Sequence, residues 1–313
     1  MLKIFEKIKK PSIQTIALVA IIALGIFLRS YNFHDWLRFN ADQARDASVV
    51  SSVVEGKEAW PLLGPKAGGT NFKLGGAFYY FEIISAKIFG NYPDKMAYPD
   101  LFFSILAMPL FYILMKKYFN SKIAIALLAI FSVSVFAIKY SRFAWNPNST
   151  PFWSMLFLYA LYEIFYAQKN KKLYLAIIAG IALGIGVQLH TLLLVFLPVM
   201  TLFFLGYMFF CKQNTWKVAL IIISVGIFLN IPQIFGEYQT GGKNIQAFFG
   251  GIGSKEKKGS GLIKNVITDT LCYSQANTYV LSGYLISDTC EIKTLKNFKA
   301  KSASAFGFVI LLR

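Results

Sequence analysis

Long apolar segments alternate with short polar segments along most of this chain. Seven runs have the length and composition of membrane-spanning helices: residues 13–29, 98–115, 122–139, 150–167, 173–190, 191–210 and 217–235. A helix needs about 20 apolar residues to cross the hydrocarbon core of a bilayer. A weaker apolar run covers 75–90, and 304–312 looks like the start of one more span. The pattern predicts an all-α, polytopic membrane protein.

The composition agrees with this prediction. Of the 313 residues, 56% are hydrophobic and only 15% are charged, and the mean hydropathy is +0.52. A soluble domain carries about 25% charged residues. The first run, 13–29, is too long for a secretory signal and is not followed by the small residues of a cleavage site, so we expect an uncleaved anchor. We expect the protein to be integral to the plasma membrane.

The formal net charge is +17, and lysines form clusters in the short segments beside the apolar runs. They gather near residues 7–10, 116–122, 169–172 and 212–217. Cytoplasmic loops of membrane proteins carry such an excess of positive charge. The N-terminus and these loops are therefore predicted to lie inside. The lysines are not interleaved with aromatic residues on a soluble surface, so we expect no nucleic-acid partner.

Segment 31–74 is expected outside and loop 116–122 inside, so an odd number of crossings must lie between them. Two apolar runs, 75–90 and 98–115, lie there, so one of them does not cross. The weaker candidate is 75–90, because Glu82 and Lys87 would each cost about 2.5–3.5 kcal/mol in the membrane. We therefore interpret 75–90 as a juxtamembrane or re-entrant helix. The alternative is that it crosses, and that the lysine pattern fails in the later loops.

The predicted organisation has three parts: residues 1–235 as a transmembrane catalytic module with an outside loop at 30–97, residues 236–303 as an extracytoplasmic loop or small subdomain, and residues 304–313 as the start of a further transmembrane helix in a chain that could be truncated. Cys272 and Cys290 lie in the second part. They could form a disulfide if that part is outside.

Asp42, Arg45 and Asp46 form the first polar cluster on the predicted outer side. Their i, i+3, i+4 spacing places them on one face of a helix. A general base must reach a substrate proton and have a tuned pKa, and neighbouring charges shift the pKa of a carboxylate. The alternative is a solvated helix face with an ion pair.

Arg142 with Asn146, and His190, are further candidates on the same side. The planar fork of an arginine can clamp a phosphate group. The alternatives are an ordinary interfacial arginine beside a turn-forming asparagine, and a structural histidine at a helix end. Tyr79 and Tyr80 follow a pair of glycines that permits close backbone approach, and they could stack on a sugar, line a lipid groove or belong to an interfacial aromatic belt.

The order of these motifs resembles the GT-C superfamily of polytopic glycosyltransferases, in particular the branch of protein O-mannosyltransferases and lipid A aminoarabinose transferases. An Asp-x-x-Arg-Asp motif follows the first span, and Gly-x-Phe-Tyr-Tyr, Ser-Arg-Phe-Ala-x-Asn-Pro and Gln-Leu-His-Thr come later. The resemblance covers roughly residues 13–235. It implies a GT-C-like helical bundle whose first extracytoplasmic loop bears the active site.

The resemblance also implies a polyprenyl-phosphate-linked sugar as donor and a hydroxyl of a protein, lipid or glycan as acceptor. By position, Asp42 would be the catalytic base, and Arg45, Arg142 and His190 would hold the donor phosphate. Further substrate contacts are expected from Asp46, Tyr79, Tyr80 and Asn146. This chain has Gln43 where many relatives have an acid, so a divalent metal is not supported, and we expect no other cofactor.

Two other functions stay open at this point: a transporter or flippase of lipid-linked sugars, and a non-catalytic membrane subunit. Transporters place ionisable groups near the midplane of the membrane. The predicted spans are nearly free of charge at that depth, which favours chemistry at one surface.

Overall fold

The computed structural model describes residues 12–68, 70–213 and 215–253, together with residues 266, 270 and 272. This part of the chain is almost entirely helical. In chain order its elements are α1 (Ile13–Ser30), α2 (Ala41–Val54), β1 (Leu63–Lys66), β2 (Lys73–Gly75), α3 (Ala77–Phe89), α4 (Pro93–Met96), α5 (Tyr98–Tyr118), α6 (Ser121–Val133), α7 (Val135–Lys139), α8 (Thr150–Tyr166), α9 (Lys169–Leu189), α10 (Thr191–Phe210), α11 (Trp216–Leu229), α12 (Ile231–Gln239) and α13 (Lys243–Gly253).

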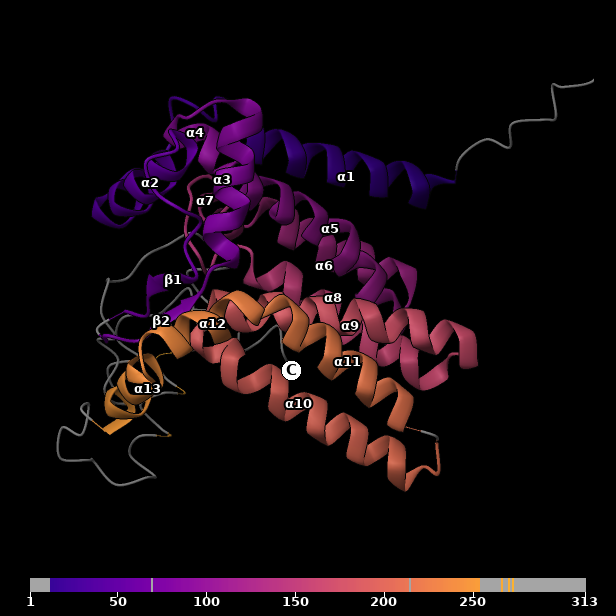
Figure 1. Ribbon diagram of the computed structural model, residues 1–313. Helices are drawn as coiled ribbons and strands as arrows, with labels where there is room; N and C mark the ends of the chain where they lie inside the picture. Colours follow the sequence, from indigo (N-terminus) through magenta and orange to yellow (C-terminus); the bar gives the residue numbers. More distant parts are fainter. Residues whose placement is uncertain are drawn as a thin grey trace, which may run out of the picture.

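The long apolar helices lie side by side in one bundle (Figure 1). Among the described residues, four helical segments are long and apolar enough to cross a membrane: Ile13–Ser30, Pro93–Tyr118, Asn170–Leu189 and Thr191–Phe210. Helices α11 and α12 make a fifth if they count as one span bent by 54°. Helices α6 and α8 are shorter, with 13 and 17 residues. The prediction of an all-α polytopic membrane protein is confirmed.

Helix α9 lies at the centre of the bundle and packs on α8, α10 and α11. Its buried face consists largely of small residues, including Ala176, Ala179 and Ala182. At Gly184 an added Cβ would come within 3.1 Å of the Leu229 side chain on α11. Small residues let helix backbones approach closely where lipid removes the hydrophobic drive for association. The glycine- and alanine-rich sequence of α9 thus sets its central position.

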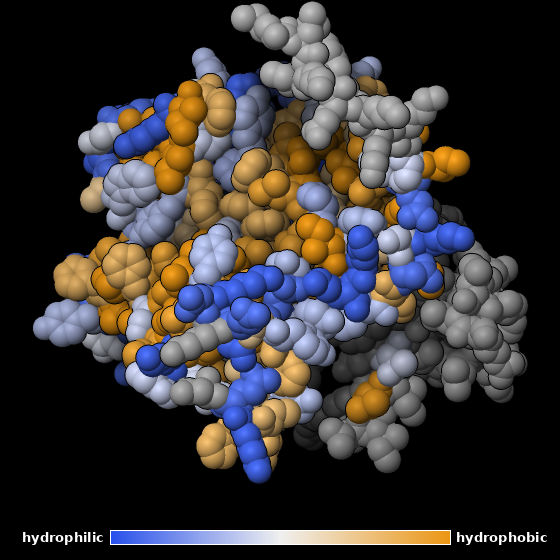
Figure 2. Space-filling view, turned by 90° about the vertical axis from the view of Figure 1, so that its right-hand side faces the viewer, coloured by the Kyte–Doolittle hydropathy of each residue, from blue (hydrophilic) through white to orange (hydrophobic). Residues whose placement is uncertain are grey.

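The lysine-containing turns meet at one end of the bundle. Glu163, near the end of α8, forms ion pairs with Lys117 of α5 and with Lys171 of α9, the latter at 3.1 Å. Lys172 Nζ lies 2.6 Å from Gln213 Oε1, in the turn after α10. Figure 2 looks onto this end, where a band of hydrophilic side chains crosses a largely apolar face. These turns thus share one end of the bundle, and their cytoplasmic location stays a prediction.

The short elements gather at the opposite end of the bundle, where α2, α3, α4, α7, β1, β2, α12 and α13 lie together (Figure 1). Helix α3, the weak apolar run, packs on α2 and α4. Its Glu82 is buried, and Lys87 Nζ lies 5.2 Å from the ring centroid of Trp60. These contacts place α3 among the short elements at this end, and the interpretation of 75–90 as a juxtamembrane or re-entrant helix stays a prediction.

A two-stranded antiparallel hairpin, β1 and β2, was not expected from the sequence. Helix α13 packs on it: Asn244 accepts a hydrogen bond from Lys73 N at 2.7 Å and donates one to Lys73 O at 3.0 Å. Phe72 and Phe248 also meet edge to face, with ring centroids 5.0 Å apart. Helix α12 runs across residue 235, where a boundary was predicted. Cys290 and residues 304–313 lie outside the described residues.

Gly75 provides a test of this packing. An alanine Cβ there would lie 2.5 Å from Gln188 Oε1 and 2.6 Å from Gln233 Oε1, so the position has no room for a side chain. We expect Gly75→Ala to lower the free energy of unfolding by about 1–3 kcal/mol, the usual range for overpacking. Thermal unfolding in detergent measures the change.

Gly206 in α10 is the matched control, because nothing lies within 4 Å of an added Cβ there. Gly206→Ala should leave stability unchanged or raise it by up to about 1 kcal/mol, since alanine favours a helix over glycine. Equal melting temperatures for the two variants would contradict the close packing at Gly75.

Candidate functional site

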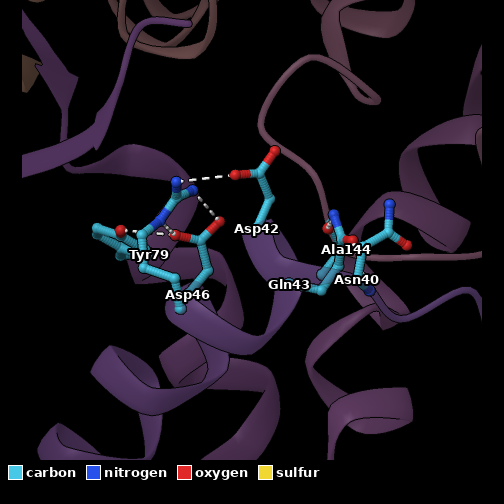
Figure 3. A network of polar contacts seen from close by, with 7 residues as sticks. Asn40, Asp42, Gln43, Asp46, Tyr79 and Ala144 are labelled. Atoms are coloured by element: carbon cyan, nitrogen blue, oxygen red, sulfur yellow. Dashed lines mark hydrogen bonds and ion pairs between the residues drawn. The ribbon is translucent and has the colours of Figure 1, made fainter.

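Gln43 fixes the start of α2. The backbone N–H of Asn40 donates to Gln43 Oε1 at 3.2 Å, and Gln43 Nε2 donates to the carbonyl of Ala144 at 3.0 Å (Figure 3). The amide therefore both accepts and donates. An ionised glutamate at this position could accept from Asn40 but could not donate to Ala144. Gln43 thus holds α2 against the segment that leads into α8.

Arg45 links the two carboxylates of α2. Its guanidinium binds both oxygens of Asp46 at 2.9 Å and binds Asp42 Oδ1 at 2.9 Å. The Asp46 side chain is 1% exposed and also accepts a hydrogen bond from the Tyr79 hydroxyl at 2.8 Å, whereas Asp42 is 56% exposed (Figure 3). The hydrogen bonds that Arg45 donates to Asp46 raise the pKa of Arg45. Asp46 is the buried base of the cluster, Arg45 is partly exposed above it, and Asp42 is the exposed tip.

Glu82 lies behind this cluster on α3 and is fully buried. Its Oε2 has no hydrogen-bond partner among the described residues. Burial, and then the neighbouring Asp46 and Asp100, raise the pKa of Glu82 well above its usual range. Arg45 forms its ion pairs with Asp46 and Asp42 and forms none with Glu82 among the described residues. Burial also raises the pKa of Tyr79, which stays a hydrogen-bond donor to Asp46.

A cavity of about 370 Å³ opens beside Asp42. Four of the residues predicted for the site line it: Asp42, Arg45, Asn146 and His190. The remaining lining residues come from the hairpin, from the segment between α7 and α8, and from the first residue of α10. They are Lys66, Ala67, Gly68, Thr70, Leu74, Trp145, Pro147 and Thr191. Segments far apart in the sequence thus build one polar cavity at the end of the bundle opposite the lysine turns.

Hydrogen bonds to the bundle hold the far wall of the cavity. Asn146 Nδ2 donates to the carbonyl of Leu189 at 2.6 Å, and Trp145 N donates to Asp100 at 2.9 Å. His190 Nδ1 accepts from Leu192 N at 3.1 Å, which caps α10. Burial lowers the pKa of His190. The imidazole is therefore neutral near pH 7 and carries its proton on Nε2, which is a hydrogen-bond donor.

Arg142 has a different surrounding from the one expected for a phosphate clamp. Its guanidinium donates to the carbonyls of Arg29, Tyr31 and Asn32 at 2.9 Å, and to that of Leu28 at 3.3 Å. These carbonyls belong to the end of α1, where a helix leaves its last acceptors without partners. Arg142 is buried and does not line the cavity. The structure gives it the role of closing α1.

Tyr79, Tyr80 and Asp46 also do not line the cavity. The Tyr80 hydroxyl donates to the carbonyl of Pro61 at 2.8 Å and fixes the chain before the hairpin. Tyr79 reaches the cavity only through Asp46 and Arg45. The aromatic segment therefore supports the site from behind, and the sugar contacts expected of the two tyrosines stay a prediction.

The sequence did not indicate Lys66, because the short hairpin that carries it lacks the alternation of apolar and polar residues typical of a strand. Lys66 lines the cavity, and its Nζ lies 3.4 Å from Asn71 Oδ1. Within the part of the chain that the structure describes, it makes no ion pair. Arg45, by contrast, faces two carboxylates. Lys66 is thus the cavity's uncompensated positive charge among the described residues.

The residues around Asp42 do not fit a divalent-cation site. Such ions are bound by several oxygen ligands, usually including carboxylates. Both oxygens of Asp46 face Arg45, and Gln43 supplies a neutral amide already bonded to Asn40 and Ala144. No group of three His, Cys, Asp or Glu side chains gathers within the described residues.

Comparison with known proteins places this geometry in context. The family described as dolichyl-phosphate-mannose-protein mannosyltransferase matches residues 77–233, half of the chain. A comparison with curated proteins finds no significant match. Among solved structures, the chain is similar to the Archaeoglobus fulgidus oligosaccharyltransferase crystallised in complex with Zn and sulfate, with 14% identity and a TM-score of 0.47. The match covers 86% of this chain and 40% of that chain.

His190 predicts a pH dependence of stability. Burial lowers its pKa from the ordinary value of 6.5, so between the two values the unfolded chain binds more protons than the folded chain. Stability should therefore fall as the pH decreases below 6.5. Thermal unfolding in detergent between about pH 5 and pH 7.5 measures this window.

His190→Asn is the informative variant. Asparagine keeps an acceptor for the Leu192 N–H at the start of α10 but does not titrate. The melting temperature of the variant should change less across this window than that of the unsubstituted protein. Parallel curves for the two proteins would show that His190 is not the group responsible.

Proposed function

The chain belongs to the dolichyl-phosphate-mannose-protein mannosyltransferase family, and we propose that it is a membrane glycosyltransferase that moves a hexose from a polyprenyl-phosphate donor to an acceptor hydroxyl. The family match confirms the resemblance predicted from the sequence. The observation that carries the proposal is the polar cavity, in which an exposed carboxylate, Asp42, lies with a lysine, Lys66, at the end of a membrane bundle. A carboxylate can remove the proton of an acceptor hydroxyl, and a lysine can stabilise the charge of a phosphate.

Asp42 is the proposed general base. One of its oxygens is held by Arg45, and the other is free of the surrounding side chains drawn in Figure 3. A base must lie within hydrogen-bond reach of the proton that it removes, and a side chain that is 56% exposed at the edge of a cavity can meet an entering hydroxyl. Arg45 fixes the orientation of this carboxylate.

The proposed reaction is a single displacement. Asp42 takes the proton of the acceptor hydroxyl while its oxygen forms a bond to the anomeric carbon of the sugar. The bond between that carbon and the phosphate oxygen breaks, and polyprenyl phosphate leaves with the electron pair. Attack from the face opposite to the leaving group inverts the anomeric configuration. The family description favours a protein hydroxyl as acceptor, and a lipid or glycan hydroxyl would react in the same way.

Lys66 is the proposed partner of the donor phosphate. Arg142 is occupied by four backbone carbonyls, and the charge of Arg45 is shared between two carboxylates. Lys66 is left to offset the negative charge that grows on the leaving phosphate. His190 Nε2 and Asn146 can add hydrogen bonds, since both line the same cavity. The expected role of Arg142 thus passes to Lys66.

The site is proposed to face outside, at the plasma membrane. The hairpin and α2, which contribute to the cavity wall, lie at the end of the bundle opposite the lysine turns (Figure 1), and positive loops stay on the cytoplasmic side. A prenyl chain extending among the helices would explain why a sugar transferase is built in a membrane. The donor would enter the cavity with its phosphate at the level of the lipid headgroups.

The distribution of charge within the bundle speaks against a transporter. Arg29 lies in the last turn of α1, Asp100 in the first turn of α5, and Glu163 near the end of α8. Transported solutes bind near the middle of the membrane, often at broken helices. The described spans carry their charges at their ends, and the polar cavity lies at one end of the bundle.

Asp42→Asn tests the base. A general base typically contributes about 10²–10⁴-fold to the rate, so we expect kcat for transfer from a polyprenyl-phosphate hexose to fall by at least about 10²-fold. The purified protein is assayed in vesicles with a hydroxyl-bearing acceptor. Asp35→Asn, in the same outside segment but away from the cavity, is the control and should keep normal turnover. Normal turnover by Asp42→Asn would remove Asp42 from this role.

Lys66→Gln tests the phosphate contact. A hydrogen bond to a charged group contributes about 1.5–3 kcal/mol, which corresponds to about 10–100-fold in affinity. The donor KM should rise by this factor, and it should change little in Lys57→Gln, whose lysine pairs with Glu55 outside the cavity. An unchanged donor KM in Lys66→Gln would assign the phosphate to other residues.

A further inference from the structure

Helix α12 carries an exposed apolar stripe that the proposed reaction does not use. Ile231, Ile234, Phe235 and Tyr238 follow the spacing i, i+3, i+4, i+7, and their exposed fractions run from 51% to 81%. The opposite side of the helix is packed: Gly236 is buried, and an added Cβ there would lie 3.0 Å from the Leu63 side chain of β1. The apolar face of an amphipathic helix normally faces the core. In α12 it faces outward.

The stripe continues the outward surface of α11. Ile227 and Phe228, in the last turn of that helix, are also exposed. Helix α11 is an apolar helix of the bundle, and its exposed side is the side that lipid would cover. The chain then bends by 54° between α11 and α12. The nine residues of α12 rise only about 14 Å, too little to cross a bilayer. The exposed apolar surface of α11 thus continues onto α12, which bends away from the bundle axis at its end.

Helices α12 and α13 are joined in a fixed geometry. Gly241 and Gly242 turn the chain with positive φ angles of 63° and 79°, which glycine adopts readily. Glu237 Oε1 accepts a hydrogen bond from Ile245 N at 2.9 Å and so supports the first turn of α13. Ile245 and Phe249 of α13 are exposed as well. The two helices therefore present apolar side chains from one rigid elbow.

We propose that the elbow formed by α12 and α13 is an interfacial anchor whose apolar side chains enter the acyl-chain region of the lipid leaflet at the cavity end of the bundle. Interfacial helices have a large apolar face on one side and polar residues on the other. The occupant is a phospholipid monolayer because the stripe is continuous with the outward face of a membrane helix. This proposal does not depend on the glycosyltransferase reaction.

The anchor would set the height of the cavity above the membrane. Asn244 holds both backbone polar groups of Lys73 on β2, and Phe248 packs on Phe72. The same hairpin carries Lys66 and Thr70 into the cavity wall. A monolayer that holds α12 and α13 therefore also holds the cavity wall close to the headgroups, where the phosphate of a lipid-borne ligand lies.

Photolabelling of the whole protein in phosphatidylcholine vesicles tests the proposal. One sample receives a lipid-soluble diazirine and the other a water-soluble diazirine, and peptide mass spectrometry maps the labelled residues. We expect the lipid-soluble reagent to label Ile234, Phe235 and Tyr238 as strongly as Ile227 and Phe228 of α11. Segment 55–58, exposed after α2, should take up only the water-soluble reagent.

The other outcomes would overturn the anchor. Labelling of the stripe only by the water-soluble reagent would mean that it faces solvent, and labelling by neither reagent would mean that the rest of the chain or another protein covers it. A second measurement uses Tyr238→Trp in vesicles with brominated acyl chains. Its added fluorescence, relative to the unsubstituted protein, should be quenched, whereas that of Lys57→Trp should not. Equal quenching of both variants would also contradict the proposal.

Discussion

The fully buried carboxylate of Asp46 is the constraint on which the cavity depends. An ionised carboxylate without water is stable only if it is paired and hydrogen-bonded, because its desolvation costs several kcal/mol. Arg45 and Tyr79 meet this requirement, and in doing so they join α2 to α3. The remaining donor of Arg45 then reaches Asp42. The ion pair between buried Asp46 and partly exposed Arg45 therefore fixes the direction of the exposed Asp42 carboxylate.

The segment between α7 and α8 extends this constraint to the bundle. Arg142 closes the end of α1, the carbonyl of Ala144 accepts from Gln43 of α2, and Asn146 binds the end of α9. One short stretch of chain thus binds three helices: it bonds to end carbonyls of α1 and α9 and to the Gln43 side chain of α2. Backbone polar groups near a membrane must be satisfied within the protein. Polar side chains at this end of the bundle bond to these backbone groups, and Asp42 and Lys66 are left to line the cavity.

The two ends of the molecule differ in what their charges do. At one end, lysines of three turns pair with Glu163 and Gln213 or extend outward. At the other end, Asp46, Asp100 and Arg142 are buried and hydrogen-bonded, and Lys66 makes no ion pair with the residues that the structure describes. The first arrangement fits a surface beside anionic lipid, and the second fits recognition of an anionic ligand. The exposed stripe of α12 lies at this second end, where such a ligand would arrive from the membrane.

The sequence by itself determined the membrane class, the approximate spans and the shared side of the lysine turns, because hydropathy and charge are local properties with a fixed length scale. It also brought forward Asp42, Arg45, Asn146 and His190, which the fold gathers at one cavity. Only the tertiary structure decided which arginine is available: Arg142 and Arg45 look equivalent along the chain, yet backbone carbonyls occupy the first and carboxylates the second. The tertiary structure also placed Lys66 at the cavity, because α13, distant in the sequence, bonds to the hairpin of β1 and β2 that carries it. Partners distant in sequence set these roles, and local patterns do not contain them.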